Sequence, residues 1–371
     1  MLQDKKCLCY LWLVLMLFSL SACDYIERLR DSKNANENEG NNRQVQLSLA
    51  VAPHIAWMPW YYADQEGILN EYSARHHLEV QFVSDDYQNL IEKFLLQEVQ
   101  AIVISNIAAI AQLVRRDIES DVILITNDSS GFEAILLPEQ TNTKHSLHGQ
   151  SFALVQFSTR HYLLDRYLIR NQVPFEEINL VNIAETDIPN AFSDKKIYGV
   201  VTRNPYLYKL THTEGAKILF DSRQIPKEIF DLLVVRRDTL NEHPEFAQVL
   251  LATWFSVMER LQGSKKGPTM DAMAGLAGLS RQELDEQLIT TPLNDTPTKA
   301  LSAIRDRRIR KTMRHIRYFI ERYDLSGSEL FSEWVSYPGR VPALLHFNGQ
   351  PLQDFVMPAV AKESLGAPSK K

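Results

Sequence analysis

The sequence predicts an α/β protein of two lobes followed by a helical C-terminal region, and two observations lead to this prediction. After Gln44, short runs rich in Val and Ile alternate with longer amphipathic stretches, which is the strand and helix order of a layered α/β sheet. After Arg237 these strand-like runs stop and only helical patterns follow. The alternating part covers about 180 residues, more than a usual single sheet, so we expect two lobes.

Short apolar runs mark the predicted strands, and amphipathic stretches mark the predicted helices. The strands are predicted at residues 45–52, 78–83, 101–105, 122–126, 134–137, 152–157, 180–183, 197–202, 218–220 and 232–235. The helices between them are predicted at residues 87–96, 107–115, 161–170 and 188–192. Polar or proline-containing stretches near 138–146 and 221–227 separate clear strand patterns, so we expect the chain to cross between lobes there. The first lobe is therefore predicted at 45–138, the second at 139–225, and a return strand with the C-terminal helices and tail at 226–371.

The C-terminal region is predicted to be helical at residues 244–261, 270–279, 281–288 and 297–323. In the last stretch, apolar residues recur at helical spacing and form one buried stripe. They are Leu301, Ile304, Ile309, Met313, Ile316, Ile320 and Tyr323. The opposite face is basic, with Arg305, Arg307, Arg308, Arg310, Lys311, Arg314 and Arg317. Two interpretations of this face stay open: a solvated helix surface, or a docking surface for a membrane partner.

Residues 1–22 have the order of a secretory signal peptide. Lys5 and Lys6 precede an apolar run over residues 8–20, and small residues follow. This run is too short to cross about 30 Å of hydrocarbon comfortably. The Leu-Ser-Ala-Cys ending at residues 20–23 resembles the bacterial lipobox, which implies that Cys23 is lipidated and becomes the first mature residue. The alternative is an ordinary signal peptide, or an anchor helix, with a chance cysteine.

Residues 23–44 are interpreted as the lipidated cysteine and a flexible tether. The stretch is polar and rich in Asn, so it cannot bury enough apolar surface to fold. Asp24 directly after Cys23 resembles the signal that keeps lipoproteins on the inner membrane of bacteria with two membranes. We therefore expect a periplasmic protein, held by its lipid, with the inner membrane as the anchoring surface.

Composition excludes several classes of site and function. The cysteines are Cys7, Cys9 and Cys23, so a mature chain that begins at Cys23 has no pair for an internal disulfide and no cysteine-based zinc site. The formal net charge of −6 argues against general nucleic-acid binding. No G-x-S-x-G, H-E-x-x-H, Walker or G-x-G-x-x-G motif is present. We expect no enzyme activity, no cofactor and no metal site.

Two stretches are candidates for binding a small ligand. Trp57, Trp60 and Tyr61 follow the first strand, and aromatic side chains there can wall a cleft. The alternative, a helix that packs these three residues and Tyr62 into one core, is disfavoured because adjacent helix positions lie about 100° apart, so the four side chains cannot all lie on one face. At residues 158–164 a strand ends and a helix begins at a Ser/Thr cap, where unpaired N–H groups suit an anion or polar head group. The alternative for this second stretch is a plain N-cap.

Residues 57–69, 158–164, 201–205 and 220–235 resemble the periplasmic substrate-binding proteins of ABC importers, in the group that takes nitrate, sulfonate, taurine and thiamine-precursor ligands. Within that group the chain is most similar to the branch found beside urea-carboxylase genes, which is linked to urea or guanidine uptake. The resemblance implies a two-lobe, type II periplasmic binding protein fold that captures a small polar ligand between its lobes for an ABC permease. The alternative is a ligand-sensing accessory lipoprotein that serves a membrane signalling partner.

The resemblance also implies ligand-binding positions in both lobes. Those of the first lobe are Trp57, Trp60, Tyr61, Asp86, Tyr87 and Asn106, and those of the second are Ser158, Thr159, Arg160 and Arg203. Arg160 and Arg203 depart from the urea-carboxylase branch, which carries Ser and Trp there. Arginine favours a carboxylate, sulfonate or phosphate, so we expect an anionic or zwitterionic ligand. Glu133 or Asp187 could instead pair with one arginine and leave a neutral site.

Overall fold

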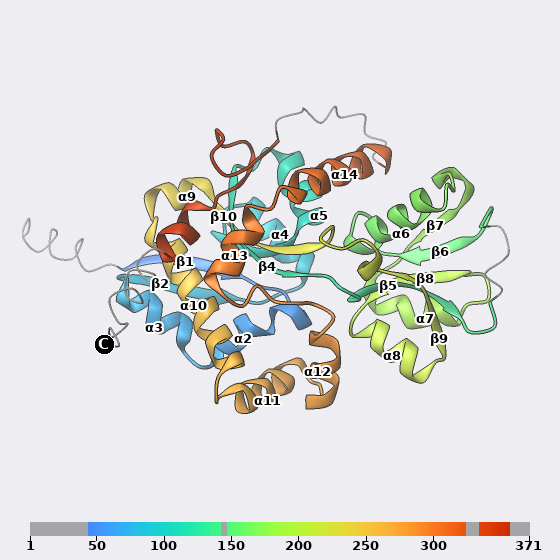
Figure 1. Cartoon of the computed structure of the whole chain (residues 1–371), viewed down its shortest axis with the longest axis horizontal. Helices are drawn as coiled ribbons and strands as arrows, with labels where there is room; N and C mark the ends of the chain where they lie inside the picture. Colours follow the sequence, from blue (N-terminus) through green and yellow to red (C-terminus); the bar gives the residue numbers. More distant parts are fainter. Residues whose placement is uncertain (1–43, 142–146, 324–333, 357–371) are drawn as a thin grey trace, which may run out of the picture. The chain divides into compact units, whose positions relative to one another are not determined.

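The computed structural model describes residues 44–141, 147–323 and 334–356, and in these ranges the chain forms two β-sheets flanked by helices (Figure 1). Both sheets belong to one compact unit of the chain, which begins at Gln46. The signal peptide, Cys23 and the tether of the sequence analysis lie outside the described residues. No helix within the described ranges is long and apolar enough to cross a membrane.

The first lobe is built on a seven-stranded sheet with the order β11-β12-β4-β10-β3-β1-β2. Its strands are β1 (Val45–Ala50), β2 (Leu78–Val83), β3 (Ala101–Ser105), β4 (Ser120–Asp128), β10 (Phe230–Arg236), β11 (Val335–Ser336) and β12 (Leu345–Phe347). Strand β10 runs antiparallel to both β3 and β4, whereas β1 pairs parallel with β3. All residues of β3, β4 and β10 are buried, as expected for central strands that helices cover on both faces.

The second lobe is built on a five-stranded sheet with the order β7-β6-β8-β5-β9. Its strands are β5 (Glu133–Pro138), β6 (Ser151–Leu154), β7 (Asn179–Asn182), β8 (Gly199–Arg203) and β9 (Ala216–Asp221). Helix α6 (Thr159–Arg170) covers one face, and α7 (Ile188–Ser193) and α8 (Tyr206–Thr213) cover the other (Figure 1). Because side chains alternate along a strand, Ala134 and Leu136 of β5 pack towards α7 and α8, and Ile135 and Leu137 join the core on the α6 face.

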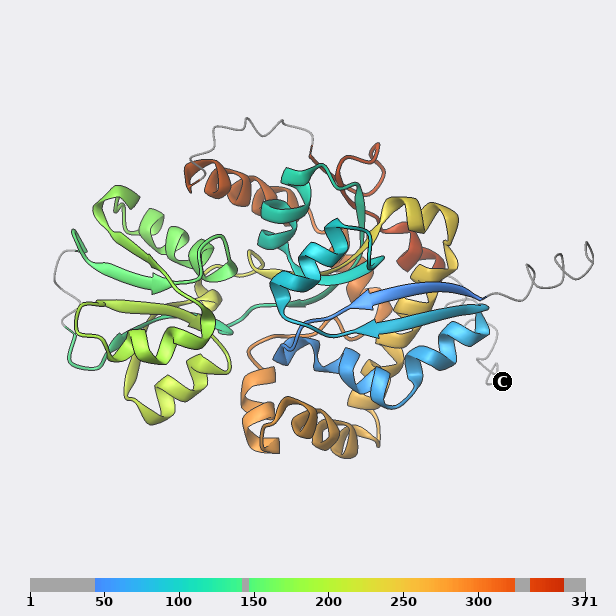
Figure 2. The ribbon, with the colours of Figure 1, turned by 180° about the vertical axis from the view of Figure 1, so that it is seen from behind.

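The remaining helical elements connect the strands and cover the first sheet. Before β5 they are η1 (Ile55–Trp57), α2 (Met58–Gln65), α3 (Ile68–Arg75), α4 (Tyr87–Leu95), α5 (Asn106–Ala108), the π-turn η2 (Ala109–Leu113) and η3 (Val114–Arg116). Short 3₁₀ turns of the second lobe and its return are η4 (Phe175–Glu177), η5 (Glu185–Asp187) and η6 (Ser222–Gln224). After β10 follow α9 (Arg237–Glu242), α10 (Glu245–Gln262), α11 (Lys266–Ala277), α12 (Arg281–Leu288), α13 (Pro297–Ile304) and α14 (Arg308–Tyr323). Seen from behind, α2 and α3 lie beside α10 and α11 (Figure 2), where these helices also contact one another.

The structure corrects three details of the predicted organisation. The helix predicted at 297–323 is two helices, because the Asp306 side chain accepts a hydrogen bond from the Arg308 backbone N–H (2.9 Å) and starts a new helix. Strands do not stop at Arg237, since β11 and β12 follow and β12 pairs parallel with β4. Strand β5 belongs to the second sheet, so the chain leaves the first sheet before Glu133, earlier than the predicted boundary at 138.

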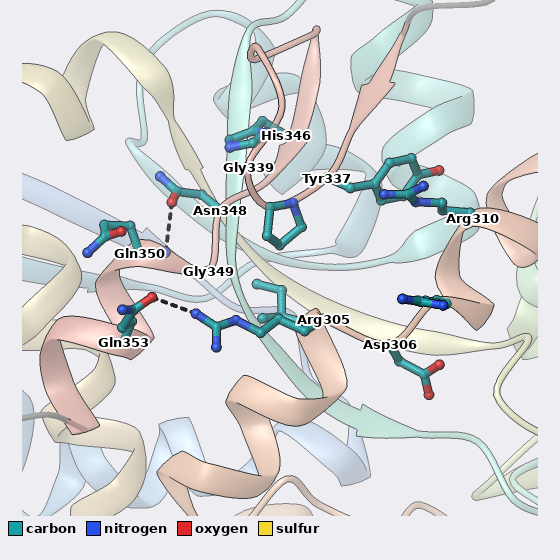
Figure 3. Close-up of a pocket in the computed structure, with 13 residues that line it drawn as sticks. Arg305, Asp306, Arg310, Tyr337, Gly339, His346, Asn348, Gly349, Gln350 and Gln353 are labelled. Carbon is teal, nitrogen blue, oxygen red and sulfur yellow. Dashed lines mark hydrogen bonds between the residues drawn. The ribbon is translucent and has the colours of Figure 1, made fainter. Parts of the chain in front are cut away.

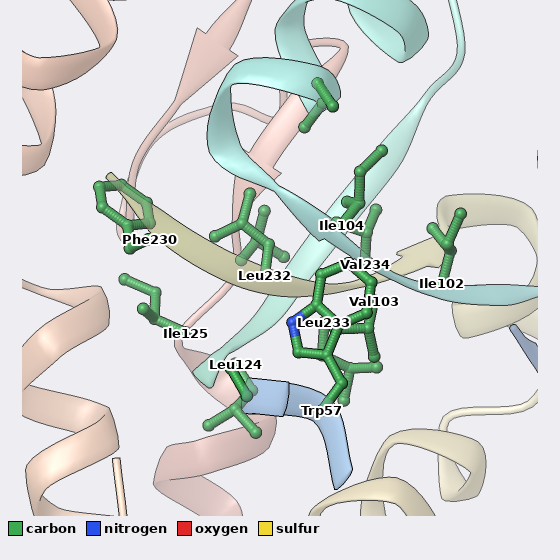
Figure 4. Close-up of a cluster of buried hydrophobic side chains, with 14 of the residues drawn as sticks. Trp57, Ile102, Val103, Ile104, Leu124, Ile125, Phe230, Leu232, Leu233 and Val234 are labelled. Carbon is green, nitrogen blue, oxygen red and sulfur yellow. The ribbon is translucent and has the colours of Figure 1, made fainter. Parts of the chain in front are cut away.

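The core of the first lobe surrounds strands β3, β4 and β10. Their apolar side chains pack against one another with Trp57 of η1 among them (Figure 4). Leu233, in the middle of β10, is fully buried. A continuous apolar run thus becomes the central strand because helices on both faces cover it.

We expect Leu233→Ala to lower the free energy of unfolding by about 2–5 kcal/mol, because it leaves a cavity in a close-packed core. Urea denaturation followed by circular dichroism measures the change. The matched control is Leu96→Ala, since Leu96 at the end of α4 is 67% exposed and its truncation should change stability by less than about 0.5 kcal/mol. Equal losses in the two variants would contradict the buried position of β10.

Candidate ligand-binding cavity between the lobes

A cavity of about 90 Å³ is lined by residues from both lobes. Its walls come from the segment after β1, the start of α4, the ends of β3 and β8, the starts of β5 and β10, and the loop that enters α6. The lining residues are His54, Trp57, Tyr87, Gln88, Ile91, Ser105, Ala108, Gln112, Glu133, Val155, Gln156, Phe157, Ser158, Thr159, Arg160, Arg203 and Asp231. A larger pocket lies wholly in the first lobe and shares none of these residues.

Trp57 forms the aromatic part of the first-lobe wall. Its ring lies 4.5 Å from the His54 ring and 5.6 Å from the Tyr87 ring, measured between centroids. Its Nε1–H donates a hydrogen bond to Oδ2 of Asp231 (2.9 Å). His54 caps η1 by accepting a hydrogen bond from Ala56 N–H (3.2 Å). The strand-to-turn connection after β1 therefore places an indole, an imidazole and a phenol side by side.

Asp231 brings a buried carboxylate to this wall. Besides the Trp57 indole, Nδ2 of Asn127 donates to its Oδ2 (2.9 Å), and Asn127 is itself fixed by Thr291 (2.8 Å). Burial raises the pKa of Asp231, while these hydrogen bonds and the charge of Arg203 act in the opposite direction. The two donors leave the other carboxylate oxygen, Oδ1, available to a ligand.

Glu133, the first residue of β5, supplies a second buried carboxyl group. It accepts a hydrogen bond from the Ser129 hydroxyl, and Ser129 also bonds Ser222 (2.6 Å). Burial raises the pKa of Glu133, and the nearby charge of Asp231 acts in the same direction. Arg160 and Arg203 oppose this shift only in part.

Arg160 enters the cavity at the start of α6. The Ser158 side chain caps the helix by accepting from Arg160 N–H (3.2 Å). The buried guanidinium forms an ion pair with Glu185 (2.9 Å) and donates to the Thr159 hydroxyl (3.2 Å). Burial lowers the pKa of Arg160, whereas the Glu185 charge counteracts that shift. Neither Glu133 nor Asp187, the two candidate partners from the sequence, forms this ion pair.

Glu185 is held as the partner of Arg160 by the second lobe itself. The Thr202 hydroxyl donates to Oε1 of Glu185 (3.0 Å). Burial alone would raise the pKa of Glu185, but the Arg160 and Arg203 charges and the Thr202 bond outweigh it, so the pKa is lowered. The pair therefore carries both charges and neutralises itself.

Arg203 ends β8 and lies directly opposite Glu133 in the antiparallel pair, so the two side chains share one face of the sheet. Among the described residues, no hydrogen bond or ion pair joins its guanidinium to another side chain. The imidazole of His54 faces the same charge: burial, then Arg203 and Arg160, hold its pKa well below the usual value. His54 is therefore neutral at neutral pH, and Arg203 is the cation left open to a ligand.

The structure brings together six of the side chains proposed from the sequence, namely Trp57, Tyr87, Ser158, Thr159, Arg160 and Arg203. The other four, Trp60, Tyr61, Asp86 and Asn106, do not line the cavity. Trp60 packs on Trp254 (5.2 Å), and the Tyr61 hydroxyl donates to Val51 O (2.8 Å). Asp86 caps α4, and Asn106 donates to Glu228 O (2.9 Å).

Sequence reasoning missed His54, Asp231 and Glu185 as members of this site. Asp231 could have been proposed from the sequence, because an acidic residue inside the apolar strand at residues 230–236 is unusual. Glu185 lies in a short 3₁₀ turn and carries no motif. In the described ranges, no cluster of three or more His, Cys, Asp or Glu side chains is arranged to hold a metal ion.

Comparison with known proteins supports the same architecture. The NMT1-like family model matches residues 96–277, slightly less than half of the chain. None of the curated protein sequences matches significantly. The periplasmic aliphatic sulphonate-binding protein SsuA of Escherichia coli superposes with a TM-score of 0.66 at 15% identity, over 78% of this chain and 96% of that one.

Two further solved structures superpose on this chain to a similar extent. A putative periplasmic sulfonate-binding protein of Methylobacillus flagellatus gives a TM-score of 0.65 at 14% identity, covering 88% of this chain and 98% of its own. The alkanesulfonate-binding protein of Xanthomonas axonopodis pv. citri, solved with bound MOPS, gives a TM-score of 0.59 at 16% identity, covering 74% of this chain and 95% of its own. The chain therefore has the two-lobe α/β fold of periplasmic binding proteins, and the fold predicted from its sequence is confirmed.

Proposed function

We propose that this protein is an extracytoplasmic solute-binding protein that captures one small polar ligand between its lobes and presents it to an ABC permease. The observation that carries the proposal is the cavity whose charged walls come from both lobes. In proteins of this fold, hinge closure brings two such walls together around a ligand. The match to the NMT1-like family and the structural likeness to sulfonate-binding proteins support a binding role in transport.

The charges of the cavity favour a zwitterionic ligand. Asp231 and Glu133 offer carboxyl groups, and Arg203 offers a guanidinium without a protein partner among the described residues. The Arg160–Glu185 pair is already neutral. A cationic group of the ligand would face Asp231 and Glu133, and its acid group would face Arg203 and the N-terminal N–H groups of α6.

The size of the cavity limits the ligand further. A volume of about 90 Å³ equals that of roughly three water molecules at liquid density. In the arrangement of the lobes described here, the cavity therefore suits a ligand with only a few non-hydrogen atoms. The Trp57 ring, beside the two carboxyl groups, also gives an ammonium or amidinium group an aromatic face to contact.

A panel of small zwitterions, anions, amidines and amides tests the function by thermal shift and calorimetry. The ligand should raise the melting temperature, because at about 100 times its Kd it stabilises the folded state by about 2.7 kcal/mol. Small zwitterions should give the largest shifts. If no compound shifts the melting temperature at millimolar concentration, the proposed binding role is wrong.

With a ligand in hand, Arg203→Gln tests the charged contact. Loss of the Arg203 guanidinium should weaken ligand binding by about 2–5 kcal/mol, since the substitution removes one partner of a buried charge pair. The matched control is Arg116→Gln, which makes the same substitution at an exposed arginine paired with Glu92. Calorimetry should show an unchanged Kd for the control, and an unchanged Kd for Arg203→Gln would exclude the arginine from the site.

The pH dependence of stability tests the buried carboxyl of Glu133. Burial raises its folded-state pKa above the ordinary 4.5, so the folded state keeps a proton that the unfolded state releases. The free energy of unfolding should therefore fall as pH rises from 4.5 through the folded pKa, and Glu133→Gln should lack this loss. Urea titrations of both proteins at a series of pH values measure the difference. Parallel profiles would show that Glu133 ionises as freely as in the unfolded chain.

We also propose that Cys23 carries the lipid that holds the protein to the membrane. The proposal rests on the lipobox-like residues 20–23, which lie outside the described part of the chain. Cys23→Ser should move the exported protein from the membrane fraction to the soluble periplasmic fraction. Fractionation and immunoblotting check this, and a variant that stays in the membrane fraction after a salt wash would contradict lipid anchoring.

A further inference from the structure

A pocket of about 610 Å³ lies in the first lobe and shares no lining residue with the cavity between the lobes. It is formed by the end of α13, the break at residues 305–307, the first turn of α14 and the segment 337–353 (Figure 3). The break that sequence analysis missed is thus one wall of this pocket. At that break the chain presents successive arginines where a continuous helix would have spread them around its axis.

Three guanidinium groups line the pocket without a carboxylate partner among the described residues. Arg305 donates to Oε1 of Gln353 (2.5 Å), and Arg310 lies over the Tyr337 ring (5.1 Å from the guanidinium carbon to the ring centroid). Arg307 forms no side-chain hydrogen bond or ion pair with the described residues. These contacts orient two of the arginines and leave their positive charge uncompensated.

The acidic side chain in the lining does not offset this charge. Asp306 is already engaged by Arg308, which lies outside the lining and donates from Nε to Oδ2 (2.8 Å). In Figure 3 the Asp306 carboxylate lies away from the Arg305–Gln353 pair. The pocket lining therefore carries three uncompensated positive charges, because Arg308 already neutralises the Asp306 carboxylate.

The opposite wall is neutral and polar. His346 shares a hydrogen bond with the Ser336 hydroxyl (2.7 Å), and burial lowers its pKa, so it is neutral at neutral pH. The amide of Asn348 donates to Oδ2 of Asp121 (3.0 Å), which turns its carbonyl oxygen towards Gln350 N–H (3.0 Å). Neither residue places a negative charge against the arginines.

We propose that this pocket is a second binding site, separate from the ligand cavity, for an anionic phosphate group. Guanidinium forks match phosphate oxygens in geometry and bind them by charge-assisted hydrogen bonds. In a chain with a formal net charge of −6, these arginines give the lining of this pocket a local positive field. The phosphate belongs either to a free small molecule or to an anionic lipid head group, since both present the same chemistry.

Calorimetric titration of the protein with inorganic pyrophosphate tests the site. The variant Arg305→Gln/Arg307→Gln/Arg310→Gln should bind pyrophosphate more than about tenfold more weakly than the parent. The matched control is Arg314→Gln/Arg317→Gln, which removes charge from the same helix outside the pocket lining and should leave the affinity within a factor of about two. Circular dichroism and melting temperature confirm that both variants are folded.

Vesicles distinguish the two sources of phosphate. Co-sedimentation with phosphatidylglycerol vesicles, compared with phosphatidylcholine vesicles, is measured at about 0.15 M salt with Cys23→Ser protein. Binding that pyrophosphate displaces identifies a lipid head group, and pyrophosphate binding without vesicle binding identifies a free molecule. No pyrophosphate binding by the parent protein, or equal weakening in the triple and the control variant, overturns the proposal. Because the ligand cavity is untouched, these outcomes are independent of the panel result.

Discussion

The burial of charged groups where the two lobes meet is the constraint on which this structure depends. Arg160 is removed from water at the start of α6, and the charge of Glu185 beside it counteracts the lowering of its pKa by burial. Removing one member of such a pair leaves an uncompensated buried charge, which costs about 3–5 kcal/mol. The second lobe accordingly fixes Glu185 through Thr202 on the neighbouring strand. The ion pair therefore links η5 and β8 to the N-terminus of α6.

The return crossing between the lobes is fixed by a second group of buried polar contacts. Glu228 accepts hydrogen bonds from Tyr162 (2.7 Å) and Arg166 (2.7 Å) of α6, and its backbone oxygen accepts one from Asn106 of the first lobe. The bonds from Arg166 and Tyr162 lower the pKa of Glu228 although burial alone would raise it. One residue thus ties the crossing to both lobes. A hinge motion between the lobes would have to preserve these bonds or exchange them.

Further from the cavity, α14 also contacts the second lobe. Arg322 near its end forms an ion pair with the buried Asp165 of α6. His161, Phe175 and Phe319 surround the ring of Tyr323 in the same place. The helix that contributes Arg310 to the proposed phosphate pocket therefore ends against the helix that contributes Arg160 to the cavity between the lobes.

The sequence was sufficient to predict the strands up to β10, because hydrophobic periodicity reports burial directly, but not the short strands β11 and β12. The bounds of β2 and β3 coincide with the apolar runs at 78–83 and 101–105. The break at Asp306 was missed because Ile304 and Ile309 continue the apolar stripe across it, and a cap formed by one aspartate leaves that pattern intact. The ion pair between Arg160 and Glu185 was not predicted, for another reason. Which carboxylate meets Arg160 depends on where η5 comes to lie, and local patterning carries no signal for that position.

The ligand class proposed for this chain is inferred from the cavity walls, because one fold serves many ligands. The solved relatives named for sulfonates share the architecture at 14–16% identity, which leaves the lining free to differ. In this chain an anion alone would satisfy Arg203 but would also approach Asp231, whose carboxylate is held ready by Trp57 and Asn127. A cation alone would satisfy Asp231 and face Arg203 instead. A molecule with both charges removes each of these repulsions, so the proposed small zwitterion would pair with both Asp231 and Arg203.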